Sequence, residues 1–204
     1  GTHPYFTGLA GMHGSRCSNI AISNCDLLIA VGARFSDRTV CKAESFAPYA
    51  DIIHIDIDPG ELGKNINTKI PLCGDVKEFL ELLLEKVDEK KEGAWNRQIQ
   101  SWKDTYAAAY KSSGSLNPQY LLNKLHELGK GKSILTTEVG QNQMWTAQYY
   151  PFTDPRTFIS SGGLGTMGFG LGAAIGAAVG RPDCRVINIA GDGSFRMNLS
   201  ELST

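Results

Sequence analysis

The chain lacks an excess of charge of either sign. It carries 20 lysine and arginine residues against 21 aspartate and glutamate residues, for a formal net charge of -1 at pH 7. Binding to nucleic acid or to an anionic membrane depends on a field of positive charge, which this composition does not supply. We therefore expect no nucleic acid and no membrane among its partners.

Long apolar runs are missing as well. No stretch approaches the roughly 20 apolar residues that a membrane-spanning helix requires, and the N-terminal residues show no signal-peptide pattern. Hydrophobic residues nevertheless make up 42% of the 204 positions. The sequence therefore predicts a globular chain with a real core, either as one large domain or as two small ones.

Paired cysteines are also absent. The five cysteines are scattered and form no CxxC pair; they are Cys17, Cys25, Cys41, Cys73 and Cys184. An odd number at irregular spacing argues against a disulfide framework and against a zinc site. Inert thiols in a reducing compartment are the better interpretation, so we expect a cytoplasmic protein.

Glycine, by contrast, is plentiful, and the first part of the chain shows an α/β pattern. The 23 glycines cluster at residues 8–14 and 162–180, where backbone without side chains can approach a ligand closely. Two near-continuous apolar runs, Leu27–Val31 and residues 52–57, predict strands of a parallel sheet covered on both faces. A helix is expected at residues 18–23.

A second helix of this part and a change of composition follow. Asp75 is suited to cap a helix through VKEFLELLLEKV. A charged stretch, residues 87–93, then precedes AWNRQIQSWKDTYAAAYKSS, which repeats apolar residues at helical spacing and predicts an amphipathic helix on a domain face. We therefore expect one domain in residues 1–90, a linker helix in 91–116 and a second domain in 117–204.

The second part of the chain also alternates helices and strands. Asn117 and Pro118 suit the first positions of a helix that ends at Gly129. Strands are expected at Ser133–Thr137, at residues 156–161 and in the run VINIA near the C-terminal end. The order strand, turn, helix, strand predicts a right-handed parallel crossover.

A glycine-rich turn in this part is the first candidate site. The turn GLGTMG, residues 163–168, matches GxGxxG, follows a predicted strand and opens a helix. That context is typical of dinucleotide binding, with a pyrophosphate at the helix N-terminus and an acid at the end of the next strand. The alternative is that these glycines only allow close packing of helix and strand.

The turn GDGS after VINIA is the second candidate site. Asp192 follows a buried strand, where a carboxylate is well placed to hold a hard cation. Mg²⁺ takes few protein ligands and completes its coordination shell with phosphate oxygens and water. The two turns could therefore hold a diphosphate and its metal together. The alternative is an ordinary turn, because Asp-Gly is a common turn pair.

Taken together, these motifs resemble those of thiamine-diphosphate enzymes, in which GDG follows an apolar strand. The order of motifs is similar to that of catalytic subunits of the acetohydroxyacid synthase (acetolactate synthase) family: GMHG, DLLIAVGARFSDR, HIDIDPGELGKN, CGDVKEFL, VGQNQMW, GGLGTMGFGLGAAIGA and GDGSFRMNLSEL. The resemblance covers nearly all of the chain. It implies an α/β fold of parallel sheets flanked by helices. It also implies that the chain is an internal fragment, with part of a Rossmann-like central domain followed by part of a thiamine-diphosphate-binding domain.

The resemblance also implies a transferase reaction in branched-chain amino acid biosynthesis. In the family, pyruvate is decarboxylated on thiamine diphosphate and the enamine adds to a second 2-keto acid, such as 2-ketobutyrate. The implied partners of the parent chain are its own copies, as a homodimer or tetramer, and a regulatory small subunit is a further candidate. The family's activating glutamate lies in an upstream domain, so no catalytic residue is expected in this fragment, which is expected to be inactive alone.

Cofactor contacts follow from the resemblance by matching positions. Met167 matches the bulky residue that holds thiamine diphosphate in its bent shape, and Asp192 matches the Mg²⁺ ligand. Asn142 departs from the histidine common in the family but can still donate a hydrogen bond. The implied contacts to thiamine diphosphate are Val139, Gly140, Gln141, Asn142, Gly165, Met167, Gly191, Asp192, Gly193 and Ser194.

A second cofactor, FAD, is implied for the first part of the chain, where it is largely structural in the family. Its implied contacts are Met12, His13, Gly14, Gly32, Ala33, Arg34, Asp56, Ile57, Asp75 and Val76. Arg34 is suited to pair with flavin or phosphate. Ser36 departs from the acid usual at its position in the family.

Three alternatives remain open on the sequence. One is another thiamine-diphosphate-dependent decarboxylase, carboligase or oxidase, such as oxalyl-CoA decarboxylase, glyoxylate carboligase or pyruvate oxidase. A second is a nicotinamide- or flavin-dependent oxidoreductase built on the GxGxxG turn. A third is a non-catalytic domain.

Overall fold

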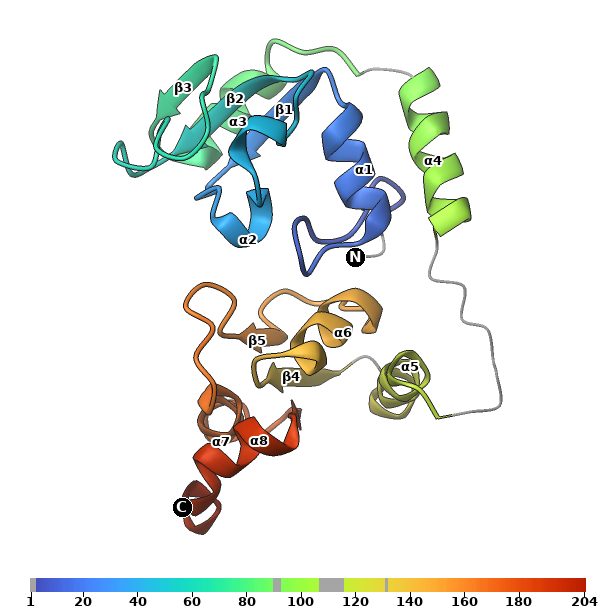
Figure 1. Ribbon diagram of the computed structural model, residues 1–204, viewed down its shortest axis with the longest axis vertical. Helices are drawn as coiled ribbons and strands as arrows, with labels where there is room; N and C mark the ends of the chain where they lie inside the picture. The colour runs from blue at the N-terminus through green and yellow to red at the C-terminus, as the bar shows by residue number, and fades with distance from the viewer. Residues whose placement is uncertain (1–2, 90–92, 107–115, 131) are drawn as a thin grey trace. The chain divides into compact units, whose positions relative to one another are not determined.

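The computed structural model of the chain describes residues 3–89, 93–106, 116–130 and 132–204 (Figure 1). It divides into two compact units: one is Leu9–Ala107, and the other is Ala108–Thr204 together with Gly1–Gly8. Each unit contains a three-stranded parallel sheet with helices against it. The α/β architecture predicted from the sequence is thus confirmed. The predicted boundaries at residues 90 and 116 stay predictions, and part of the proposed linker lies outside the described residues.

The N-terminal unit, Leu9–Ala107, is built on strands β1, β2 and β3. They are β1 (Leu27–Val31), β2 (Asp51–Asp56) and β3 (Ile70–Cys73), and they pair in parallel in that order. Its helices are α1 (Arg16–Asn24), α2 (Asp37–Val40), α3 (Val76–Leu84) and α4 (Ala94–Tyr106), with a short 3-10 helix η1 (Ala43–Ser45). The amphipathic helix α4 packs along α1 (Figure 1).

Burial in this sheet differs between its two faces. One face carries the core, in which Ala30 and Ile52 pack with Phe35 and other apolar residues. On the other face of β1, Leu27, Ile29 and Val31 are 49%, 43% and 43% exposed. The expectation that this strand is covered on both faces is therefore wrong for the described chain. Side chains alternate along a strand, and only alternate residues of β1 meet the core.

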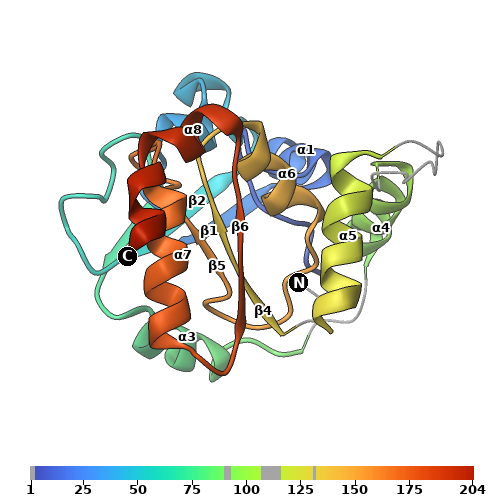
Figure 2. The same cartoon turned by 90° about the horizontal axis from the view of Figure 1, so that it is seen from below.

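The C-terminal unit, Ala108–Thr204, has its strands in the order β5, β4, β6. They are β5 (Phe158–Ser160), β4 (Ser133–Thr137) and β6 (Arg185–Ile189), all parallel. The helices are α5 (Pro118–Gly129), α6 (Gln141–Tyr149), α7 (Phe169–Gly180) and α8 (Asp192–Met197), followed by the 3-10 helix η2 (Leu199–Ser203). Helix α7 packs across the strands on one face, and α5 and α6 lie on the other (Figure 2).

Capping side chains set where several helices begin. Asp75 accepts a hydrogen bond from the Lys77 N–H at 2.7 Å, and Asn117 accepts one from the Tyr120 N–H at 2.8 Å, as predicted. Helix α5 ends at Gly129, but the left-handed residue is Lys130, with φ of 50°. Gly129 instead lies against Ser133, where a Cβ would overlap the serine Oγ.

The strand order creates a switch point between β4 and β6. From β4 the chain passes through α6 to β5 on one side, whereas β6 pairs on the other side of β4. Thr137 and Ile189 are partners in this pairing, so residues 138–142 and 190–194 leave the sheet at the same edge. Open α/β sheets bind ligands at such a switch point, outside the carboxyl ends of the strands.

Candidate cofactor site

The acid turn after β6 forms one side of this edge. Gly191 is the N-cap of α8 and Asp192 is the first helical residue, with an exposed side chain. The Gly191 carbonyl accepts the Phe195 N–H at 3.0 Å, which closes the first turn of the helix. Ser194 is buried, and its Oγ donates to the Val139 carbonyl at 3.4 Å. The acid turn is therefore tied to the neighbouring loop.

That neighbouring loop, residues 139–142, forms the other side of the edge. Gly140 has φ of +133° and is the N-cap of α6. The Asn142 side chain reaches toward both glycines: a Cβ at Gly140 would lie 3.6 Å, and one at Gly191 3.4 Å, from Nδ2. Its Oδ1 is buried and has no hydrogen-bond partner in the described part of the chain. The edge therefore combines bare backbone, an exposed carboxylate and an amide oxygen that lacks a partner.

A mostly apolar pocket of about 280 Å³ borders the same edge. Its lining includes Leu122, Trp145 and Ile189, and Asn142 is the predicted contact among the residues that line it. The predicted residues of the acid turn lie outside this lining.

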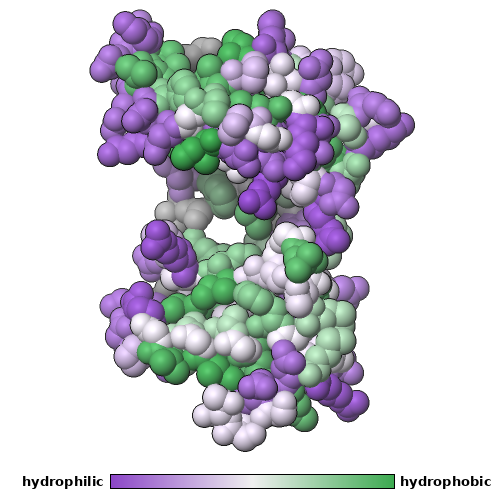
Figure 3. Space-filling model, turned by 90° about the vertical axis from the view of Figure 1, so that its left-hand side faces the viewer, coloured by the Kyte–Doolittle hydropathy of each residue, from purple (hydrophilic) through white to green (hydrophobic). Residues whose placement is uncertain are grey.

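The glycine-rich turn follows β5 at the same edge of the sheet. Ser161 holds it, because its carbonyl accepts the Gly165 N–H at 3.1 Å and its Oγ accepts the Thr166 N–H at 2.9 Å. Gly165 has φ of +70°, and Met167 is 46% exposed. Apolar residues are visible at the surface of this unit in Figure 3, and Leu164 is 88% exposed. The turn thus presents Met167 at the surface instead of packing it into the core.

The topology of this turn does not suit a dinucleotide-binding unit. Such a unit joins neighbouring strands, whereas here α7 connects β5 to β6 and β4 lies between them. The acid expected at the end of the next strand is Asp192, and it opens a helix instead. Close packing of helix and strand occurs after the turn, since a Cβ at Gly170 of α7 would lie 2.8 Å from the Glu138 nitrogen, whereas a Cβ at Gly163 in the turn would meet nothing within 4 Å.

Two polar residues of this region escaped the sequence interpretation. Glu138 is fully buried, and its two carboxylate oxygens accept the Gly168 N–H at 2.7 Å and the Leu171 N–H at 3.1 Å. Asn198 donates from Nδ2 to the Gly168 carbonyl at 2.6 Å. The sequence signal that could have identified Glu138 is an acid directly after a buried strand. The glycine-rich start of a later helix offers backbone N–H groups that such an acid can bind.

Metal-binding side chains do not gather into larger clusters in the described part of the chain. In residues 3–89, 93–106, 116–130 and 132–204 no group of three or more His, Cys, Asp or Glu side chains could hold a metal ion. A cage made of protein ligands alone therefore does not fit. An Mg²⁺ ion that arrives with a diphosphate does fit, because phosphate oxygens and water supply most of its ligands.

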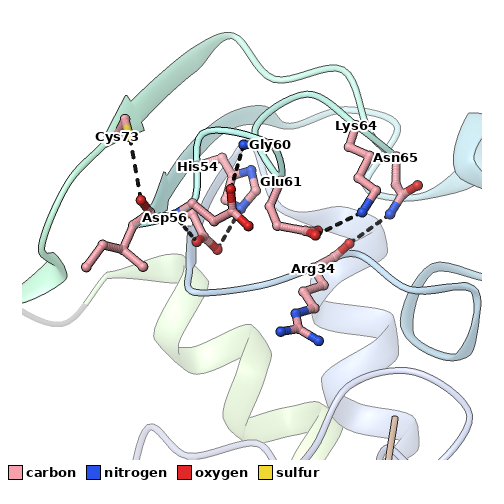
Figure 4. Close-up of polar contacts among 10 residues, drawn as sticks. Arg34, His54, Asp56, Gly60, Glu61, Lys64, Asn65 and Cys73 are labelled. Atoms are coloured by element: carbon pink, nitrogen blue, oxygen red, sulfur yellow. Dashed lines mark hydrogen bonds and ion pairs between the residues drawn. The ribbon is translucent and has the colours of Figure 1, made fainter. Parts of the chain in front are cut away.

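The residues predicted to contact FAD lie mainly at the carboxyl edge of the other sheet. Gly32 follows β1 and donates its N–H to the Ile55 carbonyl at 2.8 Å, while Gly74 follows β3 and donates to the Asp56 carbonyl at 2.9 Å. Asp56 is buried, and its Oδ1 accepts the Asp58 N–H at 2.9 Å (Figure 4). The ends of all the strands in this sheet are thus joined by backbone hydrogen bonds.

His54 is a buried neighbour of Asp56 that the sequence interpretation also missed. It is fully buried, its Nε2 lies 3.8 Å from Asp56 Oδ2, and neither ring nitrogen has a hydrogen-bond partner among the described residues (Figure 4). Its ring packs edge-on to Phe35, with centroids 4.9 Å apart. An alternating strand places residues 54 and 56 on the same face, which the motif HIDID already contained.

The remaining predicted FAD residues lie on loops around this edge. The Arg34 carbonyl accepts Asn65 Nδ2 at 2.9 Å, and its guanidinium points away from Asp56 (Figure 4). Met12 donates its N–H to the Arg38 carbonyl at 2.9 Å and lines a pocket of about 320 Å³. His13 and Gly14 follow in the same loop; Ala33 lies beside Arg34. Ile57 is 74% exposed, and Asp75 and Val76 begin α3.

None of the helices in the described ranges is long and apolar enough to cross a membrane.

Comparison with known families identifies both units. The model of the thiamine pyrophosphate enzyme central domain matches residues 1–83, and that of the C-terminal TPP binding domain of the same enzymes matches residues 138–204. The first match includes β1, β2 and β3, and the second begins directly after β4 and includes β5, β6 and the acid turn.

Curated relatives extend the similarity to nearly the whole chain. Acetolactate synthase 2, chloroplastic, of Nicotiana tabacum is 48% identical over 204 residues, which are 96% of this chain and 31% of the relative. Acetolactate synthase, chloroplastic, of Arabidopsis thaliana is 46% identical over 203 residues, 96% of this chain and 30% of the relative. The probable acetolactate synthase large subunit of Methanococcus aeolicus is 44% identical over 220 residues, 99% of this chain and 37% of the relative. The chain thus spans about a third of the length of these relatives.

Proposed function

The chain belongs to the thiamine pyrophosphate enzymes, and from this membership we propose that the protein containing it is an acetolactate synthase. Such an enzyme decarboxylates pyruvate and joins the remaining two-carbon unit to a second 2-keto acid. The observation that carries the proposal is the edge between β4 and β6. There an exposed carboxylate, Asp192, and two side-chain-free positions, Gly140 and Gly191, meet at the switch point of a family-matched sheet.

The residues of this edge divide the work of holding the cofactor. Asp192 is suited to bind Mg²⁺ through its exposed carboxylate, and Gly140 and Gly191 leave room for phosphate oxygens beside the backbone. Asn142 offers an amide whose Oδ1 has no partner in the described chain. Met167 presents an apolar side chain at the surface and would support the rings. When bound, thiamine diphosphate supplies the carbanion chemistry of the decarboxylation.

We propose that the sheet of the N-terminal unit binds FAD in a structural role. Bare backbone at Gly32 and the buried carboxylate of Asp56 lie at the carboxyl edge of its strands, where α/β proteins bind nucleotides. The cation of Arg34 is exposed beside this edge and is suited to a phosphate. The family match to the central domain supports this assignment.

Substrates, partners and compartment complete the proposal. We propose pyruvate as the first substrate and 2-ketobutyrate as an alternative second one, in branched-chain amino acid biosynthesis. The parent chain would act as a homodimer or tetramer, and a regulatory small subunit is a further candidate. We propose a cytoplasmic location, which five free cysteines support. The plant relatives are named chloroplastic, so cell fractionation distinguishes the two compartments.

The test uses the full-length protein that contains this chain. Pyruvate, Mg²⁺, thiamine diphosphate and FAD are supplied, and acetolactate is measured directly for the wild type and for Asp192→Ala. We expect the variant to lose at least about 100-fold in Mg²⁺-dependent cofactor affinity, since a metal ligand is removed. Asp183→Ala is the matched control, because this exposed acid precedes β6 at the opposite end of the strand and pairs with Arg181.

Each outcome of this experiment has a distinct meaning. Acetolactate that disappears in Asp192→Ala and persists in Asp183→Ala supports both the reaction and the metal role. Pyruvate consumption without acetolactate would indicate a related decarboxylase or oxidase. A wild type that neither binds thiamine diphosphate nor consumes pyruvate would show that the proposal is wrong.

A further inference from the structure

The backbone of Gly168 is held at both its N–H and its carbonyl by side chains of distant segments. Its N–H donates to Glu138 Oε2 at 2.7 Å, and its carbonyl accepts Asn198 Nδ2 at 2.6 Å. Gly168 has φ of +87°, a conformation that favours glycine. A Cβ at this position would lie 2.9 Å from Asn198 Nδ2, so a side chain would also disturb that contact.

Glu138 attaches Gly168 to the sheet. Its own N–H donates to the Ile189 carbonyl at 3.0 Å, which anchors it to both β4 and β6. Its carboxylate is fully buried and accepts two N–H groups at the start of α7, those of Gly168 and Leu171. A buried carboxylate is tolerated only when hydrogen bonds replace its hydration, so these contacts fix the start of α7 against the sheet.

Asn198 attaches Gly168 to α8, the helix that begins in the acid turn. It is the C-cap of α8, which begins at Asp192, and its carbonyl accepts the Glu201 N–H at 3.0 Å. Its side chain therefore connects the helix that carries the proposed metal ligand to the residue directly after Met167. A single amide joins the two turns that hold opposite ends of the proposed cofactor.

We infer that Glu138 and Asn198 are positioning residues that couple the Met167 turn to the Asp192 helix through Gly168. This inference rests on the proposed function, since it concerns how that site is held. Neither side chain is among the predicted cofactor contacts. Both act through the backbone of Gly168, Glu138 at its N–H and Asn198 at its carbonyl. Binding of the metal and diphosphate at one turn and support of the rings at the other are therefore linked.

The test compares Asn198→Ala with the wild type in the full-length protein. Ser203→Ala is the matched control, because Ser203 Oγ donates at 2.6 Å to the Ser200 carbonyl within η2 and not to Gly168. In cofactor-free protein we expect faster amide hydrogen exchange in peptides covering residues 163–171 for Asn198→Ala and no change for Ser203→Ala. At saturating Mg²⁺ we expect thiamine diphosphate to bind about fivefold more weakly, as for one lost hydrogen bond.

A merely structural effect would not give the same kinetic pattern. We expect Asn198→Ala to raise the half-saturating concentration of thiamine diphosphate while the KM for pyruvate at saturating cofactor stays unchanged. Glu138→Gln is the second variant, because it keeps the side-chain size but replaces one acceptor oxygen with an NH₂ group that faces an N–H. If the two residues act through the same residue, Gly168, the double variant should weaken cofactor binding by less than the product of the single effects.

The outcomes separate this inference from the proposed function. A wild type that binds no thiamine diphosphate overturns the proposed function and the cofactor part of the inference. Unchanged exchange at residues 163–171 in Asn198→Ala overturns the coupling, whether or not the cofactor binds. Cofactor affinity that is equal in Asn198→Ala and Ser203→Ala, in a wild type that binds it, likewise overturns the inference and leaves the function standing. Glu138→Gln that fails to fold supports the anchoring role of Glu138, and Asn198→Ala then decides the coupling.

Discussion

At the residue scale, burial controls the reactivity of the cysteines. Cys17 and Cys25 are buried, and loss of hydration raises the pKa of each thiol above its ordinary value of 9.0. For Cys17 the charge of Lys103 lowers the pKa somewhat, but burial is the larger effect. Cys41 and Cys73 are exposed. The sequence interpretation of inert thiols therefore applies to the buried pair.

These differences predict the order in which the thiols react. The thiolate is the nucleophile, so at pH 8 we expect iodoacetamide to modify Cys41 and Cys73 well before Cys17 and Cys25 in the native protein. Raising the pH should accelerate Cys17 and Cys25 only as it approaches their raised pKa values. The measurement is mass spectrometry of the modified peptides over time, with urea-unfolded protein as the control. Equal rates for Cys17 and Cys41 in the native protein would contradict this.

The same pKa shifts fix the sign of a pH effect on stability. The folded state holds the thiol protons more tightly than the unfolded state does. The contribution is therefore constant below pH 9, the unfolded value, and stability falls as pH rises through the raised folded-state pKa.

At the element scale, the contact of α7 with β4 depends on a glycine, which has no side chain to separate the helix from the strand. Gly170 is buried, and a Cβ there would lie 2.7 Å from Asn188 Oδ1 and 2.8 Å from the Glu138 nitrogen. A third neighbour, the Thr137 carbonyl carbon at 2.8 Å, is also a backbone atom, so little can move aside. Gly172, two residues later in the same helix, has open space around the corresponding position. The glycines of this helix are therefore not equivalent.

This contrast gives a matched pair of substitutions. We expect Gly170→Ala to lower the free energy of unfolding by about 1–3 kcal/mol, because it forces the helix away from the strand. Gly172→Ala should raise it by about 0.5–1 kcal/mol, because alanine favours the helix and meets nothing. Urea denaturation of both variants and the wild type measures the difference. A Gly170→Ala protein as stable as Gly172→Ala would show that α7 is not packed as described.

Element positions also show what the local sequence could predict. The apolar run Leu27–Val31 and the strand expected at Ser133–Thr137 match β1 and β4 at both ends, and the caps Asp75 and Asn117 mark where α3 and α5 begin. These signals are local: side-chain periodicity and a single capping hydrogen bond. Helix α5 ends at Gly129 as predicted, whereas strand β5 is shorter than the predicted residues 156–161. Ends of this kind depend on packing against neighbouring elements.

At the scale of the whole molecule, the chain covers about a third of its relatives and includes matches to two of their domains. We predict that the purified 204-residue chain has no acetolactate synthase activity, because the family's activating glutamate is expected in a domain outside it. The measurement is acetolactate formation from pyruvate with all three cofactors present, with the full-length protein assayed in parallel. Turnover by the 204-residue chain comparable to the full-length protein would contradict this prediction.

The sequence by itself determined the parts of this protein that are local or written in order along the chain. It determined the alternation of strands and helices, the caps, and the order of motifs that identifies the family, because each of these depends on neighbouring residues or on their succession. It also placed Met167 and Asp192 as candidate cofactor residues. Their roles stay predictions, which measurements of thiamine diphosphate and Mg²⁺ binding test.

The tertiary structure alone decided which of these motifs meet. The pairing of β4 with both β5 and β6 places residues 139–142 beside the acid turn. It also separates β5 from β6, whereas a dinucleotide-binding unit would need these two strands to be neighbours. Glu138, Gly168 and Asn198 come together only because α7 crosses the sheet and α8 returns beside its start. These contacts join residues 30 positions apart in the chain, and local propensity carries no information about contacts at such separations.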